Sequence, residues 1–343
     1  MKDQISIEAA VLQKNNSDLI IKKIFHNNVL KRNQILVKLF YTGICGSQLG
    51  EIHGVKGKDK NLPHLLGHEA TGTVLKVSKN EKEFKKNDRV ILHWQKNSKK
   101  DSINPNYYDE KNKKIGAGWV TTFNNLAVVS SNRLTKLPNN INTIEGVLFG
   151  CALTTSYGAI FNDSKINLHK NNKILICGFG MIGQTILTLL ENNNQEIWIL
   201  ENNFRKINFL NKNFSKVKFY RNVNQIKNNY FDIIYETTGN NKVIEKTYEK
   251  MKNNSKLILI GVPKHNTKIR INTLGINYGK LIIGSYGGGI KPKKDLIRII
   301  NYLKKKRIRL NKLYIGPYKF KNINSVIKFI KLGKIINKPI LKF

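Results

Sequence analysis

The sequence predicts an α/β protein in which a doubly wound parallel sheet is joined to a second domain built of strands and turns. Residues 5 to about 129 show short alternations of apolar and polar residues and almost no helical periodicity. From about residue 171, short apolar runs alternate with amphipathic segments, which is the pattern of strands and helices in a parallel sheet. A chain of 343 residues is long enough for two domains of this kind.

The first part of the chain takes its predicted strands from this alternation, which is clearest at residues 35–40, 73–77 and 89–93. Residues 95–119 are polar and rich in lysine, with little regular pattern. We expect them to form a long surface loop.

The second part of the chain carries the predicted parallel sheet. The expected strands are residues 174–177, 197–200, 217–220, 233–236, 257–260 and 281–284, with helices between them. After a glycine-rich turn at 287–289, helices are expected at about 293–306 and 323–332. A last strand is expected at 339–343.

The net charge of the chain is +38, from 60 Lys and Arg against 22 Asp and Glu. Such an excess is typical of proteins that bind nucleic acids or anionic membranes. The lysines are scattered among asparagines, however, and the densest run, residues 304–307, continues a helical pattern. We therefore interpret the charge as a feature of the overall amino-acid composition and expect no specific nucleic-acid partner.

Cysteine usage and hydropathy bear on the compartment. Only three cysteines occur, which leaves no disulfide framework and suits a reducing environment. The first residues do not resemble a signal peptide, and the longest uncharged stretch, residues 174–190, is interrupted by glycines and a glutamine. A cytoplasmic protein without a membrane partner is expected.

Three residues are candidate metal ligands: Cys45, His68 and Cys151. Two thiolates and an imidazole suit Zn²⁺, and three protein ligands leave a fourth position open, as catalytic zinc sites do. Glu69 follows His68 directly and is a further candidate ligand. The other cysteine, Cys177, ends an apolar run and is expected to be a buried strand residue.

A glycine-rich segment predicts a dinucleotide site, because it follows an expected strand and opens an expected helix. Its glycines permit a tight turn and a close approach of the backbone to a pyrophosphate at the helix N-terminus. Glu201 ends the next strand, about 20 residues further on, where an acid binds the ribose hydroxyls of NAD. NAD is therefore expected over NADP, although Lys206 could turn toward a 2′-phosphate. The candidate residues of the segment are Gly178, Gly180, Met181, Ile182 and Gly183.

The surroundings of the three candidate ligands are similar to those of a known family. They read TGICGS at 42–47, GHEATGTV at 67–74 and GCALTTSYG at 150–158. Together they resemble the medium-chain, zinc-dependent alcohol dehydrogenases, in the order of that family and over roughly residues 5–343. The resemblance implies a GroES-like β-barrel catalytic domain from residues 1–153 and 287–343, and a Rossmann domain from 154–286. A homodimer or homotetramer is expected.

The resemblance also implies an activity, which is hydride transfer between NAD and a small alcohol, such as a sugar or polyol, and its carbonyl. Ser47 is expected to take the hydroxyl proton. Glu69 is expected to lie behind the metal ligands or to exchange as a fourth ligand. Thr155, one turn beyond Cys151, is expected to lie near the nicotinamide ring.

The chain departs from the family at two places. Many members carry four cysteines around a structural zinc in the region of residues 95–119, which here contains none, so one zinc per chain is expected. Gln48 and Gly50 stand where many members have an aspartate and a histidine of a proton relay, and His53 is a candidate substitute. Two other functions remain open: a zinc-free quinone or enone reductase of the same fold, and a basic nucleic-acid-binding protein.

Overall fold

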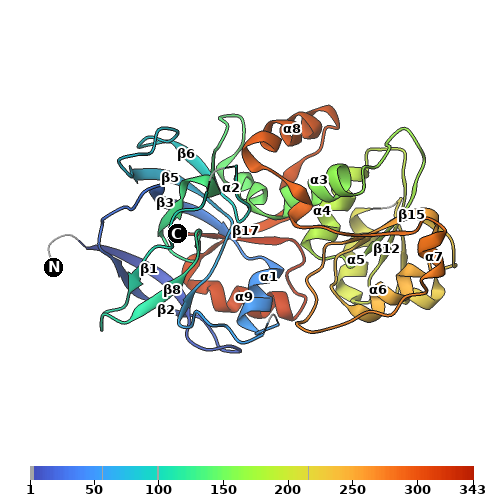
Figure 1. Cartoon of the computed structure of the whole chain (residues 1–343), viewed down its shortest axis with the longest axis horizontal. Helices are drawn as coiled ribbons and strands as arrows, with labels where there is room; N and C mark the ends of the chain where they lie inside the picture. Colours follow the sequence, from blue (N-terminus) through green and yellow to red (C-terminus); the bar gives the residue numbers. More distant parts are fainter. Residues whose placement is uncertain (1–3, 56, 99, 215) are drawn as a thin grey trace.

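The computed structural model describes residues 4–55, 57–98, 100–214 and 216–343. Two strand-rich regions lie side by side along the long axis of the molecule (Figure 1). One holds the N-terminal strands together with the C-terminus, and the other holds the parallel sheet and its helices. The fold class predicted from the sequence is confirmed, whereas the domain boundaries at 153/154 and 286/287 stay a prediction.

A small closed barrel lies at the N-terminal end. Its strands follow one another in the order β1, β2, β7, β8 and β4. They span Ile5–Leu12, Ile20–His26, Tyr107–Tyr108, Lys114–Ala117 and His64–Leu65. Apolar side chains from several of these strands fill the interior, including the fully buried Ile7, Val11 and Ile24.

The prediction of a surface loop at 95–119 is wrong in part, because β7 and β8 lie within it and complete the barrel. Tyr107 and Ile115 are fully buried there. The Arg133 guanidinium holds the segment before β7 in place, because it donates two hydrogen bonds of 2.7 Å to the Asp101 carboxylate. Strands of two and four residues are too short to show alternation, so no periodic signal marks them in the sequence.

A second sheet connects the two ends of the sequence. Its order is β10, β6, β5, β3, β18 and β17, with β9 also paired to β3. In that order the strands span Leu134–Lys136, Arg89–Leu92, Ala70–Val77, Gln34–Gly43, Lys338–Lys342 and Tyr314–Lys319, and β9 spans Leu126–Ser130. Antiparallel pairing of Ile340 with Gly43 brings the expected last strand onto β3.

The parallel sheet has the strand order β13, β12, β11, β14, β15 and β16. The strands from β11 to β16 span Lys173–Cys177, Glu196–Leu200, Lys218–Tyr220, Phe231–Glu236, Met251–Leu259 and Leu281–Gly284. Numbered from β11, this is the 3-2-1-4-5-6 order of the Rossmann fold. Each predicted strand of this region is present, and β15 begins six residues before its predicted start.

Helices connect these strands and return the chain to the second sheet. In the parallel sheet they are α4, α5, α6 and α7, at Met181–Leu190, Phe204–Asn213, Asn241–Tyr248 and Leu274–Asn277. The two predicted C-terminal helices are α8, Pro292–Lys305, and α9, Ile323–Lys331. Before the sheet, α2 and α3 span Thr143–Gly146 and Ala152–Gly158.

One helix, α1 at Gly46–Ile52, lies in the region where the sequence shows almost no helical periodicity. Its sequence, GSQLGEI, holds only two large apolar residues and two glycines, so it shows no amphipathic repeat. The helix matters for function, because it begins directly after Cys45 and carries Ser47.

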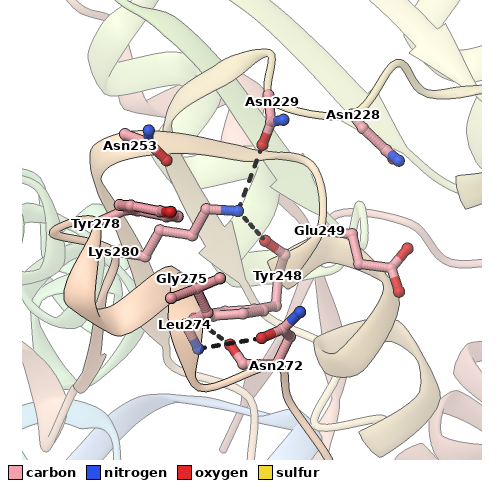
Figure 2. A pocket seen from close by; sticks show the side chains of 10 residues that line it. All are labelled: Asn228, Asn229, Tyr248, Glu249, Asn253, Asn272, Leu274, Gly275, Tyr278 and Lys280. Carbon is pink, nitrogen blue, oxygen red and sulfur yellow. Dashed lines mark hydrogen bonds between the residues drawn. The ribbon is translucent and has the colours of Figure 1, made fainter.

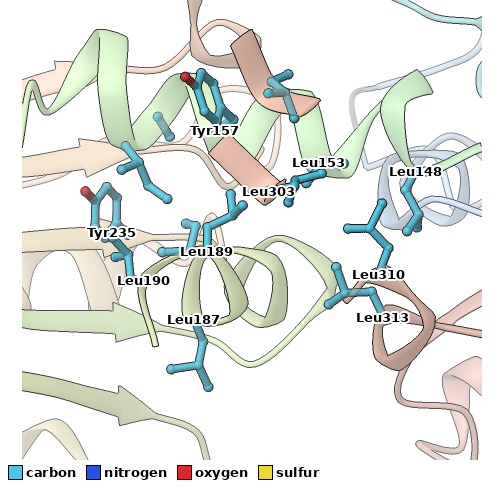
Figure 3. Close-up of a cluster of buried hydrophobic side chains, with 14 of the residues drawn as sticks. Leu148, Leu153, Tyr157, Leu187, Leu189, Leu190, Tyr235, Leu303, Leu310 and Leu313 are labelled. Carbon is cyan, nitrogen blue, oxygen red and sulfur yellow. The ribbon is translucent and has the colours of Figure 1, made fainter. Parts of the chain in front are cut away.

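A large apolar cluster joins α3, α4 and α8 (Figure 3). Leu153 and Tyr157 from α3 meet Leu189 from α4 and Leu303 from α8 in this cluster. At these contacts α3 is buried along its whole length. The position of Cys151, which directly precedes α3, is therefore fixed by packing on the parallel sheet.

Within the described ranges, no single helix has both the length and the apolar composition needed to cross a membrane. The bent pair formed by residues 143–150 and 152–163, with 51° between its parts, meets these two criteria when taken together.

Candidate active site

The three predicted metal ligands converge, although they come from separate parts of the chain. Cys45 precedes α1, His68 lies between β4 and β5, and Cys151 precedes α3. Their ligand atoms all lie within 4.8 Å of one another, and the two Sγ atoms are 3.7 Å apart. Gly150 permits this approach, because a Cβ atom there would lie 2.7 Å from the Cβ of Glu69.

The arrangement fits a zinc ion. The His68 Nε2 atom is buried, lies beside the two sulfur atoms and has no oxygen or nitrogen hydrogen-bond partner among the described residues, as expected for an atom that binds a metal. One nitrogen and two sulfur donors suit Zn²⁺, and three protein ligands leave a position for a substrate oxygen. Cys45, His68 and Cys151 are the residues that would hold the ion.

The pKa values of the two thiols are shifted in opposite directions. The hydrogen bond with Cys151 lowers the pKa of Cys45 well below its usual value, and the Lys338 and His68 charges act in the same direction. The same hydrogen bond, together with burial, raises the pKa of Cys151. The hydrogen bond between the two sulfur atoms therefore favours one thiolate in the pair, and a thiolate is the form that binds a metal.

Glu69 lies outside the three-residue ligand group, and its carboxylate is bound by Lys338. Glu69 Oε1 accepts a hydrogen bond from Lys338 Nζ, and both side chains are fully buried. The second oxygen, Oε2, is buried and has no hydrogen-bond partner among the described residues. Burial raises the pKa of Glu69, while the Lys338 charge opposes this shift. This geometry favours a position behind the ligands for the Glu69 side chain.

Gln48 occupies the space beside the ring of His68. Its Nε2 lies 2.9 Å from His68 Nδ1 and donates to Glu51 Oε2 at 2.8 Å. Its Oε1 accepts from the backbone N–H of Gly67 at 2.5 Å. His53, the candidate relay residue, hydrogen-bonds Asn16 through Nδ1 at 2.9 Å.

Ser47 and Thr155 lie close in sequence to the two cysteine ligands. Ser47 is half-buried in the first turn of α1, two residues after Cys45. Thr155 is buried in α3, and its N–H donates to the Cys151 carbonyl at 3.0 Å. The Thr155 hydroxyl oxygen is buried and finds no hydrogen-bond partner in the part of the chain that the structure describes, so it can bind a ligand that enters beside it.

The glycine-rich segment forms the predicted turn between β11 and α4. Gly178 has φ +89°, a conformation that side chains rarely adopt. A Cβ at Gly183 would lie 2.1 Å from the Gly178 carbonyl oxygen, so the helix can approach the strand only with glycine there. Around Gly180 nothing lies within 4 Å of such an atom, which leaves open space at the helix N-terminus. Met181 and Ile182 begin α4 beside this space.

Glu201 lies at the end of β12, next to the glycine-rich turn. Its Oε2 accepts from the Phe179 N–H at 2.9 Å and from Lys206 Nζ at 3.2 Å. Its Oε1 accepts from the N–H groups of Asn202 and Asn203. Burial would raise the pKa of Glu201, but the Lys206 charge and these hydrogen bonds hold it below its usual value. Glu201 is therefore a fixed carboxylate.

A cavity of about 560 Å³ opens at the carboxyl ends of the parallel strands. Gly178, Gly180, Glu201 and Lys206 all line it. Ligands of open α/β sheets bind outside the carboxyl ends of the strands, at the point where the strand order reverses. The position of this cavity is that of a dinucleotide site.

A second cavity, of about 330 Å³, lies at the amino ends of β14, β15 and β16. Asparagine side chains surround it, and Lys280 Nζ points toward Asn229 Oδ1 and the Tyr248 carbonyl at 3.5 Å (Figure 2). It lies at the end of the sheet opposite the glycine-rich turn. The two cavities are therefore separate.

Sequence reasoning missed Lys338 and the Gln48 contacts. Lys338 is one of 60 Lys and Arg residues, and its neighbours in sequence give no sign that it is fully buried. The role of Gln48 depends on contacts with residues 67 and 68, which only the folded chain brings beside α1.

Comparison with known proteins agrees with this geometry. Residues 31–139 match the alcohol dehydrogenase GroES-like domain. The chain is 23% identical to alcohol dehydrogenase-like 1 of Arabidopsis thaliana, over 96% of this chain and 94% of the relative. The structure of benzyl alcohol dehydrogenase from Acinetobacter calcoaceticus is similar with a TM-score of 0.86 at 20% identity, covering 99% of both chains. Acetophenone reductase from Geotrichum candidum, solved in complex with NAD, is similar with a TM-score of 0.78 at 18% identity, covering 98% of this chain and 97% of that one.

The strand order and the glycine-rich turn are those of a Rossmann fold, and the relatives named alcohol dehydrogenases indicate an oxidoreductase. The match of residues 31–139 to the alcohol dehydrogenase GroES-like domain, together with these relatives, confirms the family resemblance inferred from the sequence.

Proposed function

We propose that this protein is an NAD-dependent, zinc-dependent dehydrogenase that interconverts a small alcohol and its carbonyl compound. The observation that carries the proposal is the convergence of Cys45, His68 and Cys151, with a buried nitrogen on His68 that has no oxygen or nitrogen hydrogen-bond partner within the described ranges. Relatives named alcohol dehydrogenases, and a similar structure solved with NAD, support the reaction class.

The chain's own residues have separate tasks in this reaction. A zinc ion held by Cys45, His68 and Cys151 would supply Lewis-acid polarisation of the substrate oxygen, and NAD held at the glycine-rich turn would supply the hydride acceptor. Ser47 takes the hydroxyl proton and releases its own hydroxyl proton to water, and Thr155 contacts the nicotinamide ring. Glu201 accepts hydrogen bonds from the ribose hydroxyls, while Lys338 offsets the Glu69 charge behind the ligands.

The glycine-rich turn binds the pyrophosphate. Its open space at Gly180 lies at the N-terminus of α4, where backbone N–H groups and the helix dipole favour negative charge. The Glu201 carboxylate repels a 2′-phosphate, so NAD is preferred to NADP.

The test combines metal analysis with an activity screen. Purified protein should contain about one zinc per chain and should reduce NAD with some members of a panel of sugars, polyols and simple alcohols. The Cys45→Ala variant should lose the metal, whereas Cys177→Ala, which changes a buried residue of β11, should keep it. Protein without zinc that reduces quinones or enones would instead establish the zinc-free reductase.

A further inference from the structure

Two partners, the Gly67 N–H and the Glu51 carboxylate, fix the orientation of the Gln48 side-chain amide. A backbone N–H can only donate, so the atom 2.5 Å from the Gly67 nitrogen must be the amide oxygen. An ionised carboxylate can only accept, so the atom 2.8 Å from Glu51 Oε2 must be the amide nitrogen. Gln48 is also buried, with 3% of its surface exposed. The amide orientation therefore follows from chemistry at both ends.

This orientation places a donor against the ring of His68. The Gln48 nitrogen lies 2.9 Å from His68 Nδ1, so Nδ1 must accept the hydrogen bond and carry no hydrogen. In a neutral ring the hydrogen then lies on Nε2, the nitrogen that faces the cysteines.

A metal requires the opposite arrangement. A histidine that binds a metal through Nε2 carries its hydrogen on Nδ1 and almost always donates it to a carboxylate, a carbonyl or water. With the Gln48 amide in this orientation, the N–H groups of Gln48 Nε2 and His68 Nδ1 would point at each other, and both are donors. Turning the amide over would remove this conflict, but it would place two donors together at Gly67 and two acceptors together at Glu51.

We propose that Gln48 is a positioning residue that weakens zinc binding, because Glu51 and the Gly67 N–H hold its amide against the metal-binding form of His68. The inference rests on the proposed function, since it concerns the same metal site. It assigns Glu51, which lies one turn along α1, an indirect effect on the metal.

The test exchanges the two side chains in the double variant Gln48→Glu/Glu51→Gln, which leaves the net charge unchanged. The carboxylate at position 48 can accept from Gly67 N–H, from His68 Nδ1–H and from the amide at position 51. Zinc affinity, measured by competition with a chromophoric chelator, should rise about 10- to 100-fold. Equal or weaker affinity in the exchanged variant would overturn the proposal.

A second measurement reads the ring directly and needs no metal. Histidine labelled with ¹⁵N gives signals from the seven histidines, and a His68→Gln variant identifies the signal of His68. In the metal-free wild type, Nδ1 should lack hydrogen, and in the exchanged variant it should gain it. A wild-type Nδ1 that carries hydrogen in the neutral ring overturns the inference.

The two measurements separate this inference from the proposed function. If neither protein binds zinc, the proposed function fails, and the ring signals still decide whether Gln48 fixes His68. If both bind zinc equally, the proposed function stands and the role of Gln48 is overturned.

Discussion

Lys338 and Glu69 form an ion pair whose two side chains are both fully buried, and the charges of the candidate ligands Cys45 and Cys151 also act on Lys338. Lys338 lies in β18, near the end of the chain, and Glu69 follows His68. Burial favours the neutral form of Lys338, but the charges of Glu69 and the cysteines raise its pKa above the usual value. The pair therefore holds the C-terminal strand against the site.

Removing the cation should destabilise the protein. Lys338→Met leaves a buried carboxylate without its partner, which costs about 3–5 kcal/mol. Denaturant unfolding of the metal-free protein measures this loss. The control is Lys342→Met, an exposed position on the same strand. A Lys338→Met variant as stable as the control would mean that the ion pair does not form.

Ser47→Ala should slow turnover without removing the metal. The hydroxyl is expected to take the substrate proton, and general-base contributions are about 10²-fold or more. Cys45→Ala should instead release the zinc. Metal content and kcat are measured for both variants. Full activity in Ser47→Ala would exclude this role.

Glu201→Ala should shift cofactor selectivity toward NADP. The carboxylate repels a 2′-phosphate, and Lys206, now without its partner, becomes available to bind one. We expect a change of about tenfold or more in the ratio of kcat/KM for the two cofactors, which corresponds to about 1.4 kcal/mol. Glu196→Ala, at the opposite end of β12, is the control. An unchanged ratio would remove Glu201 from the ribose site.

His93 should make stability depend on pH. Burial lowers the pKa of His93 to about 4 in the folded protein, with Arg133 acting in the same direction. Two hydrogen bonds hold the His93 ring in place. Nδ1 lies 2.6 Å from the Gln95 carbonyl oxygen, and Nε2 lies 2.9 Å from the Thr135 hydroxyl oxygen. Because the unfolded chain binds a proton near pH 6.5, the stabilisation is complete above that pH.

This contribution is lost as the pH falls from 6.5 toward 4, and it amounts to about 3 kcal/mol over the whole window. Urea unfolding at several pH values measures it. The decrease in this window should be smaller in His93→Gln than in wild type. Parallel curves for the two proteins would contradict the prediction.

The sequence predicted the parallel sheet well, because each strand there is a short apolar run between amphipathic helices. It also named the candidate ligands Cys45, His68 and Cys151, because their surroundings resemble a family. It missed α1 and the two- and four-residue barrel strands, which are too short for periodicity. Lys338 could not be recognised, since its burial depends on pairing between β18 and β3.

That pairing has a consequence for how the chain matures during synthesis. Strands β11 to β16 follow one another in sequence and can assemble as they emerge, whereas Tyr41–Gly43 of β3 must wait for β18. Until then this part of β3 is an open strand edge, and Glu69 has no Lys338 beside it. A nascent chain should therefore complete its candidate metal site only after residue 338 has left the ribosome.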